Sequence, residues 1–202
     1  MDFVPNKHPN EEQRTSADAP AAAAAGDGER LVLEEAAEKH REAAMALKQE
    51  FLDAGEPVMN GSALLDQMEF DEWLANCARN SSPDTVSSDW AVATTYFAVR
   101  ASDGAVVGMI DVRHSLATDY LKEYAGHIGY SVRPSLRRRG YATQMLALAL
   151  EKCRAFGVPV ARLGCYASNE ASIRTIEANG GTLVEEKPYL DGIPMRIYEI
   201  AL

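Results

Sequence analysis

Cysteine is scarce in this chain, and long apolar runs are missing. Only Cys77, Cys153 and Cys165 occur among the 202 residues. They follow no metal-ligand spacing, and an odd, sparse set disfavours a disulfide framework, so we expect reduced thiols. No apolar run approaches the roughly 20 residues that span a bilayer. The amino-terminal residues lack the basic start and apolar core of a signal peptide. We therefore expect a cytoplasmic protein with no metal and no membrane partner.

Basic residues are also in the minority. Lys and Arg number 20 and Asp and Glu 30, which gives a net charge of −10. Nucleic-acid binders need a basic face, so we expect no nucleic-acid partner. The positive charge is nevertheless uneven, because six basic residues and one acid, Glu151, lie between residues 133 and 154. A local basic stretch on an acidic protein suits a discrete anionic ligand.

The composition is that of one globular domain. Of the 202 residues, 47% are hydrophobic and 25% are charged, which suffices for a sizeable core. Residues 1–28 carry almost no large apolar side chains beyond Phe3 and Val4. Because such a segment cannot bury enough surface to offset its lost conformational entropy, we expect a disordered tail. The folded domain is therefore expected over residues 29–202.

Hydrophobic periodicity and turn residues divide this domain into helices and strands. Helices are expected at residues 35–54, 67–79, 115–124, 142–156 and 170–179. Strands are expected at residues 31–33, 93–100, 106–113, 127–132, 160–165, 182–188 and 195–201. This order predicts an α+β (mixed α/β) fold, a twisted mixed sheet of about six to seven strands flanked by helices.

The most informative segment is Arg137-Arg138-Arg139-Gly140-Tyr141-Ala142, which follows an expected strand and opens an expected helix. Gly140 lets the main chain approach a ligand closely, and Ala142 keeps that approach open. The N–H groups of the first helical turn and the helix dipole attract an anion. A pyrophosphate is the natural occupant, although three arginines at a helix start are also compatible with a solvated basic edge.

Two motifs resemble those of the GNAT superfamily of N-acetyltransferases. One is Arg137-x-x-Gly140-x-Ala142 after Gly-Tyr-Ser-Val-Arg-Pro134, and the other is Ser168-Asn169-Glu-Ala-Ser172 at a helix start. The motifs stand about thirty residues apart, each between a strand and a helix, and this combination is specific. The resemblance covers roughly residues 90–200 and makes residues 29–80 the helices on the acceptor side. It implies a GNAT-like fold, acetyl-CoA as cosubstrate and an amine as partner, and it allows a homodimer.

The resemblance also implies which residues hold acetyl-CoA. Main-chain N–H groups of the loop and the first helical turn would wrap the pyrophosphate. These residues are Arg137, Arg138, Arg139, Gly140, Tyr141, Ala142 and Thr143. The strand through Tyr130 and Val132 would hydrogen-bond the pantetheine arm, as an added strand does. Asn169 would bond the pantetheine amide, and Ser172 is assigned to the same site. A plain helix cap is the other interpretation of Asn169.

Acetyl transfer to an amine needs a base and a polarised carbonyl. A main-chain N–H near Val132 would meet the carbonyl oxygen. His127 is our candidate for the base, because imidazole titrates near neutral pH and the residue starts the strand that would line the thioester. The alternative for His127 is a hydrogen-bonded structural histidine. His114 is a weaker candidate, and a water relay would serve as well.

The proton donor for the leaving thiolate is not evident. Many family members place a tyrosine seven residues after the asparagine, but this chain has Ile176 there. Ser172 or Tyr189 could substitute. Cys165 ends a strand near the expected thioester, but a small buried residue is favoured over an acetyl-cysteine, so we expect direct transfer.

The acceptor pocket is expected between the first two helices, the 55–66 loop and the 113–126 segment. Phe70, Trp73 and Tyr124 could line it, although Trp73 at helical spacing is also typical of a core residue. The predicted activity is acetyl transfer from acetyl-CoA to a primary amine of a small molecule or protein. The alternative is a non-catalytic acyl-CoA-binding module or sensor, which Ile176 favours.

Overall fold

The computed structural model describes residues 29–202, and the expected tail at residues 1–28 lies outside them. The strands are β1 (Leu31–Glu35), β2 (Ala93–Arg100), β3 (Val106–Arg113), β4 (Ile128–Val132), β5 (Val160–Tyr166), β6 (Thr182–Pro188) and β7 (Pro194–Ala201). The helices are α1 (Arg41–Asp53), α2 (Phe70–Asn80), α3 (Tyr141–Ala155) and α4 (Glu170–Ala178). Short 3₁₀ turns lie at Glu38–His40 and Pro134–Leu136, and a π-helical turn lies at Leu121–Ala125.

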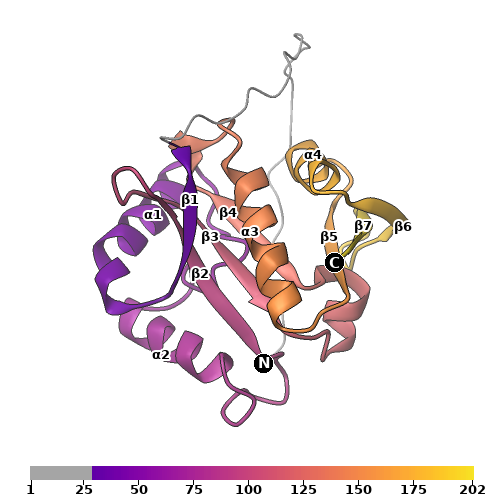
Figure 1. The fold of residues 1–202 in the computed structure, drawn as a ribbon, viewed down its shortest axis with the longest axis horizontal. Helices are drawn as coiled ribbons and strands as arrows, with labels where there is room; N and C mark the ends of the chain where they lie inside the picture. The colour runs from indigo at the N-terminus through magenta and orange to yellow at the C-terminus, as the bar shows by residue number, and fades with distance from the viewer. Residues whose placement is uncertain (1–28) are drawn as a thin grey trace.

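Within residues 29–202 the strands form two antiparallel sheets. One has the order β1-β2-β3-β4 and the other β5-β7-β6. The expected α+β class and the seven strands are confirmed, and the new feature is their division into a four-stranded and a three-stranded sheet. β4 and β5 are the facing strands of the two sheets, and α3 connects them along the chain (Figure 1).

Helices cover both faces of the four-stranded sheet (Figure 1). On one face, Phe97 and Met109 pack with buried side chains of α1 and α2. On the other, Ile110 packs with α3, and the same core continues to Leu163 of the second sheet. Met109 and Ile110 are neighbours in β3 and point to opposite faces, as strand geometry requires. α3 therefore holds the two sheets together on one side.

The expected boundaries hold best where periodicity is strong. In α3, Leu146, Ala149, Leu150 and Cys153 are buried at the expected helical spacing. The first helix starts later than expected, because pairing with β2 extends β1 to Glu35 and a 3₁₀ turn follows. The second helix also starts later, at Phe70. No helix among residues 29–202 has the length and apolar character needed to cross a membrane.

Candidate active site

The loop before α3 has the geometry of an anion cradle. Gly140 caps the helix with a φ of +79°, and a Cβ built there would meet no heavy atom within 4 Å. The helix start has no side-chain cap, and the N–H of Gln144 reaches back to the Gly140 carbonyl at 3.2 Å. The N–H groups of residues 141–143 precede that bond and have no acceptor in the part of the chain that the structure describes. Unpaired N–H groups at a helix start suit an anion, and the space beside Gly140 is open.

The cradle is clamped to the carboxyl-terminal end of α1. The Arg137 guanidinium donates two hydrogen bonds of 2.7 Å to the Glu56 carboxylate, and its Nε donates to the Val132 carbonyl at 3.2 Å. Glu50 accepts a hydrogen bond from the Ser135 N–H at 2.7 Å. Arg137 therefore shapes the loop from its outer side. Arg138, with φ of +64°, and Arg139 are exposed and form no ion pair with residues 29–202.

β4 presents a free edge beside this loop. The Arg113 N–H bonds the His127 carbonyl, and the Arg133 N–H bonds the Val107 carbonyl, each at 2.8 Å. Hydrogen bonds alternate along an antiparallel strand, so odd-numbered residues of β4 face β3. The main-chain groups that face the opposite edge belong to Ile128, Tyr130 and Val132. No strand of the described chain pairs with that edge, so an extended ligand with amide groups can add to it.

β4 and β5 meet only at the start of β4. The His127 N–H bonds the Arg162 carbonyl at 2.7 Å, and the Arg162 N–H donates to His127 Nδ1 at 3.0 Å. Burial and the charges of Arg113 and Arg162 lower the pKa of His127. The neutral ring therefore carries its proton on Nε2, and Nδ1 is engaged. This contact matches the alternative of a hydrogen-bonded structural histidine.

A hydroxyl pair bridges β4 and α4. The Tyr130 hydroxyl lies 2.8 Å from Ser172 Oγ. Burial raises the pKa of Tyr130 to about 12, against a smaller opposing effect of the Ser172 hydrogen bond. Asn169 caps α4 by accepting from the Ser172 N–H at 3.1 Å, as the plain-cap interpretation expects. Ile176, one turn further along α4, is buried in the core.

The start of α3 is fixed from two further sides. Asn179, at the end of α4, donates from Nδ2 to the Thr143 carbonyl at 3.2 Å and to the Thr175 carbonyl at 2.9 Å. The buried Tyr141 side chain accepts a hydrogen bond from Arg100 at 3.0 Å. The predicted cofactor residues at the start of α3, on β4 and at the start of α4 thus belong to connected elements.

On the far side of β5, four tyrosines cluster. Tyr189, in the β6–β7 turn, packs edge-on against Tyr120, Tyr124 and Tyr166 at centroid distances of 6.5, 5.2 and 5.6 Å. The Tyr166 hydroxyl donates to Asp191 at 2.9 Å. Burial, and then the Tyr120 hydroxyl, raise the pKa of Tyr189. Tyr124 and Tyr189 were candidates from the sequence, whereas Tyr120 and Tyr166 were not. Tyr166 directly follows the expected strand at residues 160–165, and this position was the available signal.

Several other candidates serve the fold. The His114 ring stacks on Phe156 at 3.7 Å. The Asp111 carboxylate is buried, pairs with Arg113 at 3.5 Å, and has a pKa raised by burial. The Trp73 side chain is fully buried and donates from Nε1 to the Ser62 carbonyl. In the described part of the chain, no three His, Cys, Asp or Glu side chains gather in a way that could hold a metal ion.

The comparisons with known proteins identify the family. A family model described as an acetyltransferase (GNAT) domain matches residues 30–182. The chain belongs to the GNAT acetyltransferase family. The predicted family, fold and enzyme class, an acyltransferase, are therefore confirmed. Among curated proteins, no sequence matches the chain significantly.

Solved structures share the GNAT fold at low sequence identity. A putative acetyltransferase, yncA from Salmonella typhimurium, solved with acetyl-CoA, has a TM-score of 0.61 and 17% identity, covering 85% of this chain and 94% of its own. A putative GNAT acetyltransferase from Bordetella pertussis has a TM-score of 0.61 and 20% identity. The match covers 85% of this chain and 96% of that protein. A Salmonella typhimurium enzyme that modifies the N-terminal serine of ribosomal protein L7/L12 has a TM-score of 0.59 and 18% identity. The match covers 85% of this chain and 95% of that protein.

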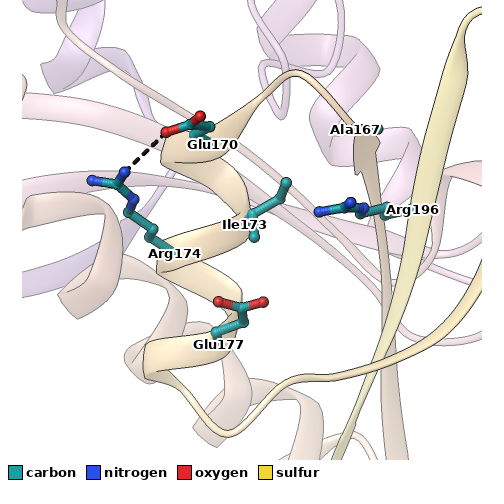
Figure 2. Close-up of a pocket in the computed structure, with 6 residues that line it drawn as sticks. All are labelled: Ala167, Glu170, Ile173, Arg174, Glu177 and Arg196. Carbon is teal, nitrogen blue, oxygen red and sulfur yellow. Dashed lines mark hydrogen bonds and ion pairs between the residues drawn. The ribbon is translucent and has the colours of Figure 1, made fainter. Parts of the chain in front are cut away.

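A shallow depression of about 430 Å³ lies elsewhere on this GNAT domain, between α4 and β7 (Figure 2). It is lined by Ala167, Glu170, Ile173, Arg174, Glu177 and Arg196. The Glu170–Arg174 ion pair of 2.9 Å lies at its rim. Helical spacing places Ser172 and Ile176 on another face of α4. This depression is therefore separate from the cradle and from the free edge of β4.

Proposed function

We propose that this GNAT protein transfers the acetyl group of acetyl-CoA directly to a primary amine of a small molecule or protein. The observation that carries the proposal is the adjacency of two main-chain surfaces whose N–H groups have no partner in the described chain. One is the set of N–H groups at the start of α3, and the other is the outward edge of β4. Coenzyme A carries a pyrophosphate and a pantetheine arm with two amides, and these surfaces complement both groups.

In this proposal, residues 137–143 hold the pyrophosphate. Open space at Gly140 and the free N–H groups of the first turn of α3 supply the contacts. Arg138 and Arg139 add positive charge, whereas Arg137 keeps the loop in place through Glu56. The edge of β4 at Tyr130 and Val132 aligns the pantetheine arm, and a main-chain N–H of this edge polarises the thioester carbonyl. Asn169 keeps its side-chain NH₂ group available for a pantetheine carbonyl while its Oδ1 caps α4.

We propose that the Tyr130–Ser172 hydroxyl pair donates the proton to the departing thiolate. The pair stands one turn before Ile176 on α4, and the phenol, supplied from β4, is kept protonated by burial. As the thiolate leaves, Ser172 gives it a proton and takes one from Tyr130, and Tyr130 regains through water the proton that the acceptor amine loses. Burial also raises the pKa of Cys165, so this residue is a thiol at neutral pH. A thiol is a poor nucleophile, which favours direct transfer over an acetyl-cysteine.

We propose that the amine approaches between the 55–66 loop and the tyrosine cluster. Gly61 of that loop packs onto β4 so closely that a Cβ on Gly61 would lie 2.1 Å from the Gly129 carbonyl oxygen. The tyrosine faces and Asp191 suit an ammonium group before it loses its proton. Because both ring nitrogens of His127 are engaged or protonated, a water relay is the route we favour for that proton. The similar enzyme that modifies an N-terminal serine supports a protein amino group as one class of acceptor.

The test is CoA release from acetyl-CoA in the presence of amine panels, including polyamines, aminoglycosides and peptides with different N-terminal residues. Acceptor-dependent CoA release supports the transferase. Tight acetyl-CoA binding with no turnover on any acceptor would favour the alternative, an acyl-CoA sensor. We place the activity in the cytoplasm, because Cys77, Cys153 and Cys165 are unpaired thiols in the structure, as is usual for reducing compartments.

A further inference from the structure

Where β4 meets β5, a side-chain ring takes the place of a main-chain acceptor. His127 contacts Arg162 twice, once through its own N–H and once through ring atom Nδ1. The chain bends at Gly126, with φ of +67°, so no carbonyl of this segment is presented to the Arg162 N–H. His127 is only 7% exposed. The ring therefore satisfies a partly buried donor that has no other acceptor in the described chain.

The charges around the ring favour the form that can accept. Arg113 of β3 and Arg162 of β5 are the charged groups that face His127, and both are positive. Arg113 also donates to the Gly126 carbonyl at 3.2 Å and pairs with Asp111 at 3.5 Å, so its guanidinium is held in place. A positive charge on the ring is disfavoured beside these two arginines. His127 therefore presents a lone pair at Nδ1, and a protonated ring would turn this contact into two opposed N–H groups.

The position of this contact determines where the two sheets separate. Tyr130 and Val132, whose outward main-chain groups form the free edge, follow three and five residues later. From His127 onward, β4 has no further hydrogen bond with β5. A shift at the junction would therefore displace the whole free edge relative to α4 and to the start of α3.

We propose that His127 is a positioning residue for the acyl-CoA site. Its Nδ1 holds the start of β4 against β5. This contact fixes the separation between the free edge of β4 and β5 that the pantetheine arm requires. That the ligand is an acyl-CoA rests on the proposed function, whereas the contact between His127 and Arg162 is a property of the free protein. The role differs from that of a general base, because the working atom accepts a main-chain hydrogen bond and takes no proton from the acceptor amine.

Two amide variants separate these roles. In His127→Asn, the side-chain oxygen can occupy the place of Nδ1, but the side chain cannot act as a base. In His127→Gln, the amide reaches one bond further and leaves the Nδ1 position without an acceptor. The two variants match in polarity, and thermal unfolding shows whether each is folded. The readouts are amide exchange of Arg162 by NMR in the free protein, CoA affinity by calorimetry, and kcat and KM for acetyl-CoA.

We expect His127→Asn to retain slow exchange at Arg162, CoA affinity within about threefold of wild type, and turnover. We expect His127→Gln to speed exchange at Arg162 and to weaken CoA binding by about tenfold, the effect of one lost buried hydrogen bond, with a smaller change in kcat. The proposal is overturned if Arg162 exchange in His127→Gln equals that of the wild type. It is also overturned if both variants lose kcat while CoA affinity is unchanged, since that result assigns a base. If the wild type acetylates no amine, the proposed function fails. The amide-exchange comparison still shows whether His127 holds β4 against β5.

Discussion

At Gly140, the backbone conformation and the access of a ligand both depend on the absence of a side chain. Its φ of +79° is unfavourable for other residues, and a side chain there would project into open space at the start of α3. Gly157, at the other end of the same helix, has φ of +77° and the same open surroundings. The two glycines therefore share the conformational requirement and differ in their proximity to the cradle. This difference separates the structural effect of a substitution from its effect on the ligand.

We predict that Gly140→Val lowers CoA affinity by about 10- to 100-fold, because the side chain displaces at least one charge-assisted hydrogen bond to phosphate. Gly157→Val is the control. Both variants should lose a similar stability of about 1–2 kcal/mol from the left-handed conformation. Calorimetric titration with CoA and thermal unfolding measure the two effects. Equal CoA affinities in the two variants would contradict the site.

We predict that Ser172→Ala and Tyr130→Phe each lower kcat by about 100-fold, the usual contribution of a positioned proton donor. KM for acetyl-CoA should change little, because the pair acts on the leaving group. The double variant should be no slower than the slower single variant, since the two hydroxyls form one chain at 2.8 Å. Steady-state kinetics at saturating acceptor measure this. Independent, multiplicative losses would argue that the pair has no shared role.

At the scale of elements, carboxylates at the end of α1 and just after it hold the loop between β4 and α3 in place. Two of the three arginines of this loop have no ion-pair partner in the described chain. Arg137 is committed to Glu56, and Arg138 and Arg139 are exposed. The sequence could show that three arginines precede Gly140. It could not show which of them would pair with a carboxylate 81 residues away along the chain. Such a contact depends on how α1 packs, and no local pattern encodes it.

We predict that Arg138→Ala and Arg139→Ala each weaken CoA binding by about two- to fivefold and reduce its dependence on salt, because exposed charges are screened by ions. Arg137→Ala should weaken binding without reducing the salt dependence, since its charge is already paired. Arg174→Ala, at the depression between α4 and β7, is the control and should leave binding unchanged. Titrations at low and high salt test this. A reduced salt dependence in Arg137→Ala would reverse the assignment.

The junction of β4 and β5 makes the stability sensitive to acid. The folded protein lowers the pKa of His127 below its ordinary value of 6.5, so the unfolded chain binds the proton first as pH falls. The contribution of His127 is complete above about pH 6.5 and is lost as pH falls through the folded-state pKa. We predict that His127→Asn lacks this part of the acid dependence. Urea unfolding of both proteins between neutral pH and pH 5 measures the difference; parallel curves would exclude it.

At the scale of the whole molecule, the sequence supported the element order, the α+β class and the family motifs. Strong periodicity located α3, and turn residues located most strand ends. The separation of the strands into two sheets was not visible, because β4 and β5 come together only at residues 127 and 162, which lie on opposite sides of α3 in the chain. The tyrosine cluster was missed for a similar reason, since Tyr120, Tyr166 and Tyr189 come from three separate segments.

The outer edge of the three-stranded sheet is β6, which is almost entirely exposed. Its pairing with β7 shifts register between Leu183 and Glu185, and it ends at Pro188. An irregular edge with charged residues and proline resists pairing with another strand. A homodimer, which the family resemblance allows, is therefore not expected to form by strand pairing at β6.

A crystal structure of the protein with CoA tests the central claim most directly. We predict the pyrophosphate within hydrogen-bonding distance of the N–H groups at the start of α3, with the pantetheine arm alongside Tyr130 and Val132. The tyrosine cluster and the depression between α4 and β7 should hold no part of CoA. Density for the pyrophosphate in that depression, or a β4 edge with no contact to the pantetheine arm, would contradict the account.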